Sequence, residues 1–217
     1  MCRSIDIMIA GAQKAGTTSL HRYLSTHPAV VTHTQTEMVY FFSDQVYNEG
    51  YKKAFKRYFA PQFERESKVV VAKNVSTMDS ELAVKRLAKH DLETKVVVVL
   101  RQPVDRAYSA YWQARRQGLE FRSFEDAISE GPAPFSNDPY RYFNCSYLQR
   151  SKYVEAIKRL FNTFGSDRIQ IFLFEDIKTQ PLACCQRILH NYKVSLDNEL
   201  FNTTTIHNVS AQPKFPF

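Results

Sequence analysis

The sequence has 217 residues, of which 44% are hydrophobic and 24% charged, the ordinary balance of a globular protein. Lys and Arg outnumber Asp and Glu by 29 to 22, and the net charge of +7 suits anionic ligands without identifying one. No apolar run approaches the roughly 20 residues that cross a bilayer, and the N-terminus lacks the apolar core of a signal peptide. We therefore expect a cytoplasmic protein, and loss of a Golgi-type membrane anchor stays open.

Strand-like apolar runs alternate with helical patterns along the chain, which is typical of a parallel sheet covered by helices. The clearest strand is Lys95–Leu100, a run of β-branched residues of the kind buried on both faces. Strands are expected at residues 5–11, 30–33, 68–72, 95–100 and 168–174. Helices are expected from the end of the first turn to about residue 24, and at residues 48–59, 81–89, 104–117, 147–164 and 181–192. A Pro-rich surface loop is expected at residues 131–139, and no regular element at residues 201–217.

The four cysteines are Cys2, Cys145, Cys184 and Cys185. None belongs to a Cys-x-x-Cys pair or to a Cys/His cluster with the spacing of a zinc site. We therefore predict free thiols and no metal site.

The segment Gly11–Thr18 (GAQKAGTT) follows the first expected strand and precedes a helix. A glycine turn at this place aims backbone N–H groups and the positive end of the helix dipole at an anion. Lys14 adds a mobile charge, and Thr17 and Thr18 add hydroxyl donors. The sequence therefore predicts a phosphate-binding loop here.

This loop differs from the pattern of nucleoside-triphosphate sites, in which a lysine and a hydroxyl residue follow the second glycine. Thr17 occupies the lysine position, and the lysine of this loop lies inside it at Lys14. A triphosphate site also needs a metal-binding Asp at a neighbouring strand end, but Lys95–Leu100 is followed by Arg101. These departures argue against phosphoryl transfer from ATP.

Two motifs carry a resemblance to a known family. GAQKAGTTSL, from Gly11, resembles the 5′-phosphosulfate loop of sulfotransferases that use 3′-phosphoadenosine 5′-phosphosulfate, and LRQPVDRAYSAYW, from Leu100, resembles their 3′-phosphate motif. The branch that contains heparan sulfate sulfotransferases and many microbial homologues is the most similar. The resemblance implies that the donor contacts the loop residues Gln13, Lys14, Ala15, Gly16, Thr17 and Thr18.

The second motif also fits a phosphate site on physical grounds. Arg101 at a strand end and Ser109 on the following helix can both reach one phosphate. The alternative for Arg101 is a structural ion pair with Asp105 or Glu175, and the presence of the first loop favours phosphate binding.

Sulfuryl transfer requires a base for the acceptor's proton and cations for the leaving phosphate. Lys14 is the candidate cation at the bridging oxygen of the donor. TEMVYFF, from Thr36, resembles a Lys-Glu-x-x-Phe-Phe segment of the family, which implies that Glu37 is the base. Thr36 stands where the family usually has Lys, which puts the substrate class in doubt. His33 is the rival base, and an ordinary surface carboxylate is the alternative for Glu37.

Three further candidates come from the resemblance. Lys73 matches a lysine that contacts the sulfuryl group or the acceptor, with a solvated lysine as the alternative. Tyr153 belongs to a segment near the nucleotide, on the expected helix at residues 147–164, where it could equally be a core residue. Lys214 belongs to a late loop that closes on the nucleotide.

We therefore predict an α/β fold, similar to P-loop nucleotide kinases, with a mostly parallel sheet of about five strands and helices on both faces. One sulfotransferase domain is expected over residues 1–217, and absence of a short C-terminal element stays open. The predicted function is metal-independent transfer of a sulfuryl group from 3′-phosphoadenosine 5′-phosphosulfate, which leaves adenosine 3′,5′-bisphosphate, to a hydroxyl or amine, with a saccharide favoured. The alternatives are an inactive nucleotide-binding module and a P-loop kinase; no nucleic-acid partner is expected.

Overall fold

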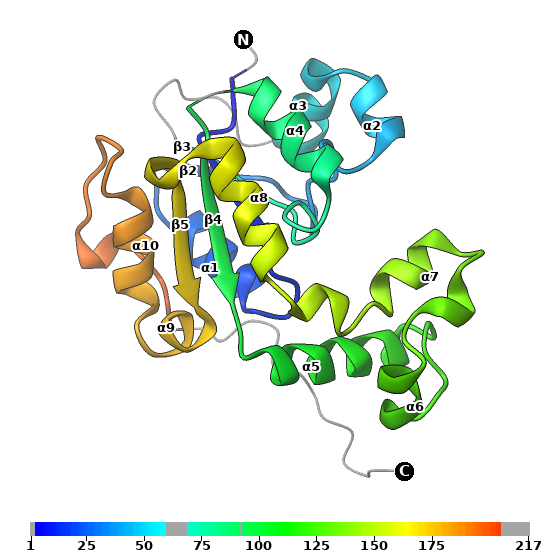
Figure 1. Cartoon of the computed structure of the whole chain (residues 1–217). Coiled ribbons are helices and arrows are strands. Elements are labelled where there is room, and N and C mark those ends of the chain that lie inside the picture. Colours follow the sequence, from blue (N-terminus) through cyan, green and yellow to red (C-terminus); the bar gives the residue numbers. More distant parts are fainter. Residues whose placement is uncertain (1–2, 60–68, 92, 205–217) are drawn as a thin grey trace. The chain divides into compact units, whose positions relative to one another are not determined.

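A five-stranded sheet, in which every pairing is parallel, organises the computed structural model of this protein (Figure 1). The strand order is β2-β3-β1-β4-β5. The three inner strands are almost wholly buried, as their runs of β-branched and other apolar residues predict. The parallel α/β architecture expected from the sequence is confirmed. The strands are β1 (Ile7–Gly11), β2 (Val30–Thr32), β3 (Val69–Lys73), β4 (Lys95–Leu100) and β5 (Ile169–Leu173).

The structure describes residues 3–59, 69–91 and 93–204. They fall into two compact units, one formed by residues from 1–100 and 156–208 and the other centred on residues 101–155. Within the described ranges, no helix is both long enough and apolar enough to cross a membrane.

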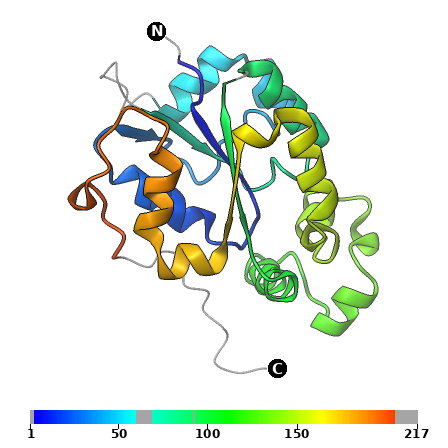
Figure 2. The same cartoon turned by 60° about the vertical axis from the view of Figure 1, so that its left-hand side comes forward.

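Helices cover both faces of the sheet in the first unit. α1 (Thr17–Ser25) and α10 (Pro181–Leu189) pack against each other on one face, and α4 (Glu81–His90) and α8 (Val154–Phe164) lie over the other (Figure 2). The serine before α4 acts as its N-cap, because the Ser80 side chain accepts a hydrogen bond from the N–H of Ala83. The other helices of this unit are α2 (Asp44–Asn48), α3 (Tyr51–Phe59) and α9 (Phe174–Thr179), with 3-10 turns at Ser166–Arg168 and Asn198–Leu200.

The second unit is helical and has a small core of its own. Buried alanines of α5 (Pro103–Arg116) pack with Tyr111, Cys145 and Tyr147. The buried Glu120 pairs with Arg122 at 2.7 Å and accepts a hydrogen bond from the Tyr147 hydroxyl at 3.2 Å, which satisfies a charge inside this core. The shorter elements are α6 (Phe124–Ser129), α7 (Pro139–Asn144) and 3-10 turns at Ala133–Phe135 and Gln149–Ser151.

Several predicted helix boundaries are wrong. The helix expected at residues 147–164 is a 3-10 turn followed by α8. The turn ends at Lys152, whose backbone (φ −86°, ψ 78°) is not helical. The helix expected at residues 48–59 begins only at Tyr51, after Gly50, whose φ is +88°. The Pro-rich loop expected at residues 131–139 contains a 3-10 turn, and the short helices α2, α6, α7 and α9 were not expected.

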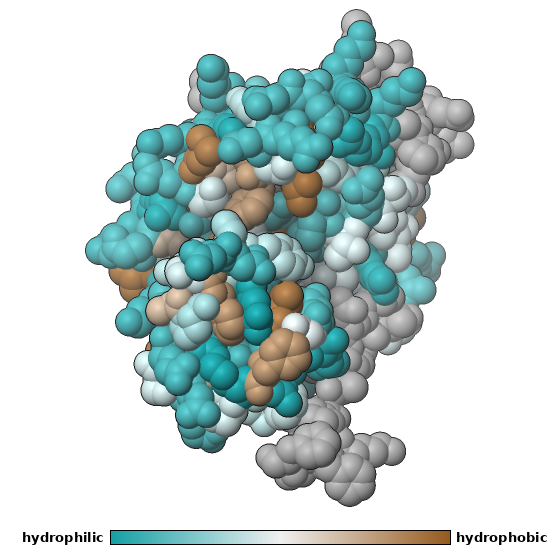
Figure 3. Space-filling view, turned by 90° about the vertical axis from the view of Figure 1, so that its right-hand side faces the viewer, coloured by the Kyte–Doolittle hydropathy of each residue, from teal (hydrophilic) through white to brown (hydrophobic). Residues whose placement is uncertain are grey.

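The surface carries few concentrated apolar areas on the face shown in Figure 3, where brown apolar side chains form separate small patches among teal hydrophilic ones. Such scattering is normal for a globular surface. Cys145, Cys184 and Cys185 are free and buried, as predicted for thiols of this chain.

The strand order creates a switch point between β1 and β4. These two strands are neighbours, but the chain passes from β1 to β2 at one edge of the sheet and from β4 to β5 at the other. Open α/β sheets bind ligands outside the carboxyl ends of the strands at such a point. The segments that follow β1, β2, β3 and β4 are therefore where a site is expected.

Candidate active site

The loop after β1 has the backbone of an anion cradle. Gly16, at the start of α1, has a φ of +84°, and Lys14 also lies in the left-handed region with a φ of 68°. The first turn of α1 contains no acidic residue, so its positive dipole end is not neutralised from within the helix. Thr17 and Ala15 are buried, while Gln13, Lys14 and Thr18 are partly exposed. These features suit binding of a phosphate or sulfate group.

Gly16 is required by its conformation and by its neighbours. A Cβ atom at this position would lie 3.0 Å from Cδ2 of Phe174, on top of the strain that a side chain suffers at this φ. We expect Gly16→Ala to lower the free energy of unfolding by about 1–2 kcal/mol, measured by urea denaturation. Gly50→Ala is the matched control, because Gly50 has a φ of +88° and nothing within 4 Å. An equal loss of unfolding free energy in both variants would show that contact with Phe174 does not contribute to the effect at Gly16.

Glu37 and Lys73 form an ion pair at the carboxyl ends of the strands. Lys73 is the last residue of β3, and its ammonium group donates to Oε1 of Glu37. The Lys73 side chain is only 1% exposed, whereas 27% of the Glu37 side chain reaches solvent. The other carboxylate oxygen of Glu37 accepts from the N–H of Val75 at 3.0 Å. Lys73 is therefore not a solvated lysine. The Glu37 carboxylate is fixed by two hydrogen bonds but remains partly accessible to solvent.

Burial and pairing act on Lys73 in opposite directions. Removal of the ammonium from water lowers the pKa of Lys73, and the Glu37 carboxylate counteracts that shift. In the register of the sheet Lys73 lies beside Ile9, two residues before the loop begins at Gly11. The ion pair and the loop thus occupy the same edge of the sheet.

His33, directly after β2, has backbone partners on both ring nitrogens. Nδ1 is 2.6 Å from the carbonyl oxygen of Gln35, and Nε2 accepts from the N–H of Lys73 at 2.9 Å. The ring is 3% exposed, and burial lowers the pKa of His33 to about 4. In this arrangement neither nitrogen is available to take a proton from an acceptor.

Arg101 and Ser109, the residues expected to bind the second phosphate, belong to the second unit. Arg101 follows β4 directly, and Ser109 lies on α5, where its hydroxyl is buried. Within the described ranges of the chain, Ser109 Oγ has no hydrogen-bond partner. A buried hydroxyl in this condition is unusual and fits a site that a ligand completes.

Tyr153 and Lys214, the two remaining candidates, do not contribute a described contact to the strand-end ion pair. The Tyr153 hydroxyl donates to the carbonyl oxygen of Arg101 at 2.9 Å, so this side chain supports the backbone there. Tyr153 does not lie on a helix as expected but immediately before α8. Lys214 falls outside the described residues.

Sequence reasoning did not single out His21 on α1, whose ring lies against that of His33. Its ring centroid is 4.5 Å from that of His33, and the side chain is buried. The sequence offered no specific signal for this contact, because nothing in the local pattern of α1 indicates which strand end its buried face meets.

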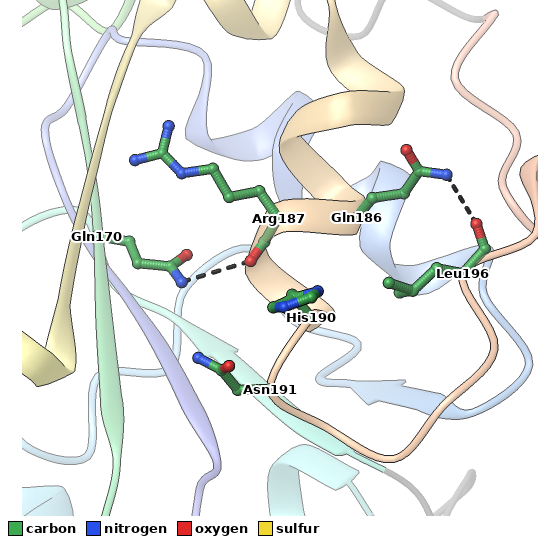
Figure 4. A pocket seen from close by; sticks show the side chains of 6 residues that line it. All are labelled: Gln170, Gln186, Arg187, His190, Asn191 and Leu196. Carbon is green, nitrogen blue, oxygen red and sulfur yellow. Dashed lines mark hydrogen bonds between the residues drawn. The ribbon is translucent and has the colours of Figure 1, made fainter.

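A separate hollow lies between β5 and α10, with a volume of about 580 Å³ (Figure 4). It is open, and most of its lining residues carry polar side chains. Two of these side chains are already hydrogen-bonded, since Gln170 donates to the Arg187 carbonyl and Gln186 to that of Leu196. None of the candidate residues lines it. We place the candidate active site at the strand ends instead, because the Glu37–Lys73 ion pair and the loop after β1 lie at the same edge of the sheet there. The lining residues are Gln170, Gln186, Arg187, His190, Asn191 and Leu196.

The chain belongs to the sulfotransferase domain family, whose pattern matches residues 4–214. It is 26% identical over 189 residues to human bifunctional heparan sulfate N-deacetylase/N-sulfotransferase 2, covering 83% of this chain and 21% of that protein. It is 29% identical over 184 residues to bifunctional heparan sulfate N-deacetylase/N-sulfotransferase 1 of Xenopus tropicalis, covering 81% of this chain and 20% of that protein. The chain thus spans about a fifth of the length of these relatives.

Solved structures agree with this assignment. A sulfotransferase from Alicyclobacillus acidocaldarius superposes with a TM-score of 0.78 at 25% identity, covering 94% of this chain and 86% of that one. The sulfotransferase domain from the curacin biosynthetic pathway shares the fold alone, with a TM-score of 0.58 at 12% identity and coverage of 94% and 79%. This chain is therefore a sulfotransferase domain of the P-loop-like α/β fold.

Proposed function

We propose that this sulfotransferase takes its sulfuryl group from 3′-phosphoadenosine 5′-phosphosulfate and transfers it, without a metal ion, to a hydroxyl or amine. The observation that carries the proposal is the pairing of the partly exposed Glu37 with the buried Lys73, beside the strand that leads into the Gly11–Thr18 loop. A base and an anion cradle on one edge of a sheet are what sulfuryl transfer requires.

The residues that would hold the donor fit its anionic groups. The backbone and hydroxyls of residues 13–18 suit the 5′-phosphosulfate, and the left-handed turn at Gly16 supports this role. Arg101 and Ser109 suit the 3′-phosphate, and the unsatisfied buried hydroxyl of Ser109 is the supporting observation. Tyr153 would hold the backbone of Arg101 in place. Lys214 stays a proposed further phosphate contact.

The bound donor supplies an activated sulfuryl group with a phosphate leaving group. Glu37 takes the proton of the acceptor hydroxyl or amine through its exposed side, while Lys73 and the Val75 N–H keep the carboxylate oriented. Lys14 stabilises the negative charge that develops on the leaving oxygen. His33 is the weaker candidate for the base, because both of its nitrogens are bonded to backbone groups.

A saccharide is the acceptor class that we favour. The support is the resemblance to relatives named as heparan sulfate N-sulfotransferases, together with the basic net charge of +7, which suits an anionic sugar polymer. Thr36, in place of a lysine common in the family, removes one positive charge beside Glu37. We therefore expect weaker dependence on acceptor charge than a lysine would give.

Calorimetric titration with adenosine 3′,5′-bisphosphate tests the donor assignment. We expect binding of equal strength in magnesium and in a chelating buffer, because the predicted phosphate contacts are backbone N–H groups, hydroxyls and cationic side chains. Absent binding, or binding only with magnesium, would overturn the assignment. An acceptor series of N-unsubstituted saccharide, N-acetylated saccharide and simple alcohol, followed by radiolabelled sulfate transfer, then tests the acceptor class.

A further inference from the structure

The buried imidazole of His33 connects the backbone near Glu37 to the backbone of Lys73. His33 follows β2, its ring packs on the ring of His21, and the edges of Tyr58 and Phe59 complete its apolar surroundings at ring-centroid distances of 6.1 Å. A ring buried in this way must have both nitrogens satisfied.

The two hydrogen bonds define a single tautomer. A carbonyl oxygen only accepts, so the bond from Nδ1 to the Gln35 carbonyl places the proton on Nδ1. A backbone N–H only donates, so Nε2 must be the unprotonated nitrogen that receives the N–H of Lys73. His33 is therefore neutral, and it joins the backbone two residues before Glu37 to the backbone of Lys73 itself.

A second tie lies on the other side of Glu37. The N–H of Met38 donates to the carbonyl oxygen of Lys73 at 2.8 Å. Both backbone polar groups of Lys73 are thus bonded to the segment that carries Glu37, one through His33 and one directly. The segment 33–38 has no regular secondary structure, so hydrogen bonds of this kind hold it in place. Two others come from the Asn74 side chain to the Met38 carbonyl at 3.2 Å and from the Thr34 N–H to the Tyr58 carbonyl at 3.3 Å.

We propose that His33 is a positioning residue for sulfuryl transfer: its neutral ring clamps the Gln35 carbonyl to the Lys73 N–H and so fixes the Glu37 carboxylate against the Lys73 ammonium. This inference rests on the proposed role of Glu37 as the base. A proton on Nε2 would repel the Lys73 N–H. Burial lowers the pKa of His33 to about 4, so Nε2 stays unprotonated at neutral pH.

Two substitutions at His33 separate positioning from other roles. Each variant keeps one of the two bonds: the side chain of His33→Gln reaches as far as Nε2 and can accept from the Lys73 N–H, whereas His33→Asn reaches only as far as Nδ1 and can serve only the Gln35 carbonyl. Gln35 is exposed, so its carbonyl can bond to water instead, but the N–H of the buried Lys73 cannot. We expect His33→Asn to lower kcat about 10-fold or more, with the affinity for adenosine 3′,5′-bisphosphate unchanged and His33→Gln recovering most of the rate.

His27 provides the matched control. It is equally buried, and both of its nitrogens have backbone partners, the N–H of Ala29 at 3.1 Å and the carbonyl of Ser195 at 2.8 Å. We expect His27→Asn to lower the melting temperature as His33→Asn does but to leave kcat unchanged. A similar fall of kcat in His27→Asn would show that the effect of His33 is general destabilisation.

The remaining outcomes are distinct. Equal losses of 100-fold or more in His33→Gln and His33→Asn would make His33 the base and overturn its positioning role. Unchanged kcat in His33→Asn would also overturn it. Failure of the proposed function would appear elsewhere, as absence of sulfate transfer by the unmodified protein or as full activity of Glu37→Gln.

Discussion

Replacement of Glu37 by glutamine is expected to lower kcat by about 10²–10⁴-fold, the usual contribution of a general base. The amide cannot take the proton of the acceptor, but its size and shape are those of the carboxylate. Binding of adenosine 3′,5′-bisphosphate should change by less than about 3-fold, because Glu37 belongs to the proposed acceptor side of the site. Steady-state sulfate transfer and calorimetry measure the two quantities.

The same substitution carries a cost in stability. Both partners of the Glu37 carboxylate are donors, the Lys73 ammonium and the Val75 N–H, and a glutamine amide has a single acceptor oxygen. We expect a loss of about 1–3 kcal/mol in unfolding free energy from the unsatisfied donor, so rates must be compared well below the melting temperature. Glu81→Gln, which breaks the exposed pair with Lys85, is the control that should change neither quantity. Retained turnover in Glu37→Gln would assign the base to another residue.

Ser109→Ala is expected to weaken binding of adenosine 3′,5′-bisphosphate by about 10–100-fold, the effect of losing one hydrogen bond to a charged phosphate. Unlike most losses of a buried hydroxyl, this one should not destabilise the free protein, because Ser109 Oγ has no partner among the described residues. Titration calorimetry and thermal denaturation of the same sample test both expectations.

Ser146→Ala is the matched control for this prediction. Ser146 is also buried in the second unit, but its hydroxyl donates to the carbonyl of Tyr142 at 2.7 Å. We expect Ser146→Ala to reduce stability and leave nucleotide affinity unchanged, the reverse of Ser109→Ala. Unaltered affinity in Ser109→Ala would place the 3′-phosphate away from this hydroxyl.

The sheet could be predicted because its strands are specified locally. Lys95–Leu100 has the bounds expected from its β-branched run, and the other four strands lie within two residues of the expected ends. The carboxyl-end rule for parallel sheets also brings the expected candidates of the first unit to one edge. Boundaries failed where one residue interrupts a good helical pattern, as at Gly50 and Lys152, since apolar spacing alone does not register a change of backbone angle.

The contacts inside the candidate site were beyond the sequence because they join residues far apart in the chain. Glu37 and Lys73 are 36 positions apart, and His33 and the Lys73 N–H are 40 apart. A lysine after a strand is usually solvated, and only the packing around β3 shows that this one is 1% exposed. Similarly, the tautomer of His33 follows from which backbone groups face its nitrogens, and no sequence pattern encodes it.

The burial of Lys73 has a consequence for how this site can change over generations. Loss of the carboxylate at position 37 alone would leave an uncompensated ammonium in the interior, and loss of the ammonium alone would release the carboxylate from its orientation. Variants in which only one of the two residues is replaced are therefore expected to lose both stability and activity. Positions 37 and 73 should be inherited as a unit, so that descendants of this chain retain both charges or replace the two together.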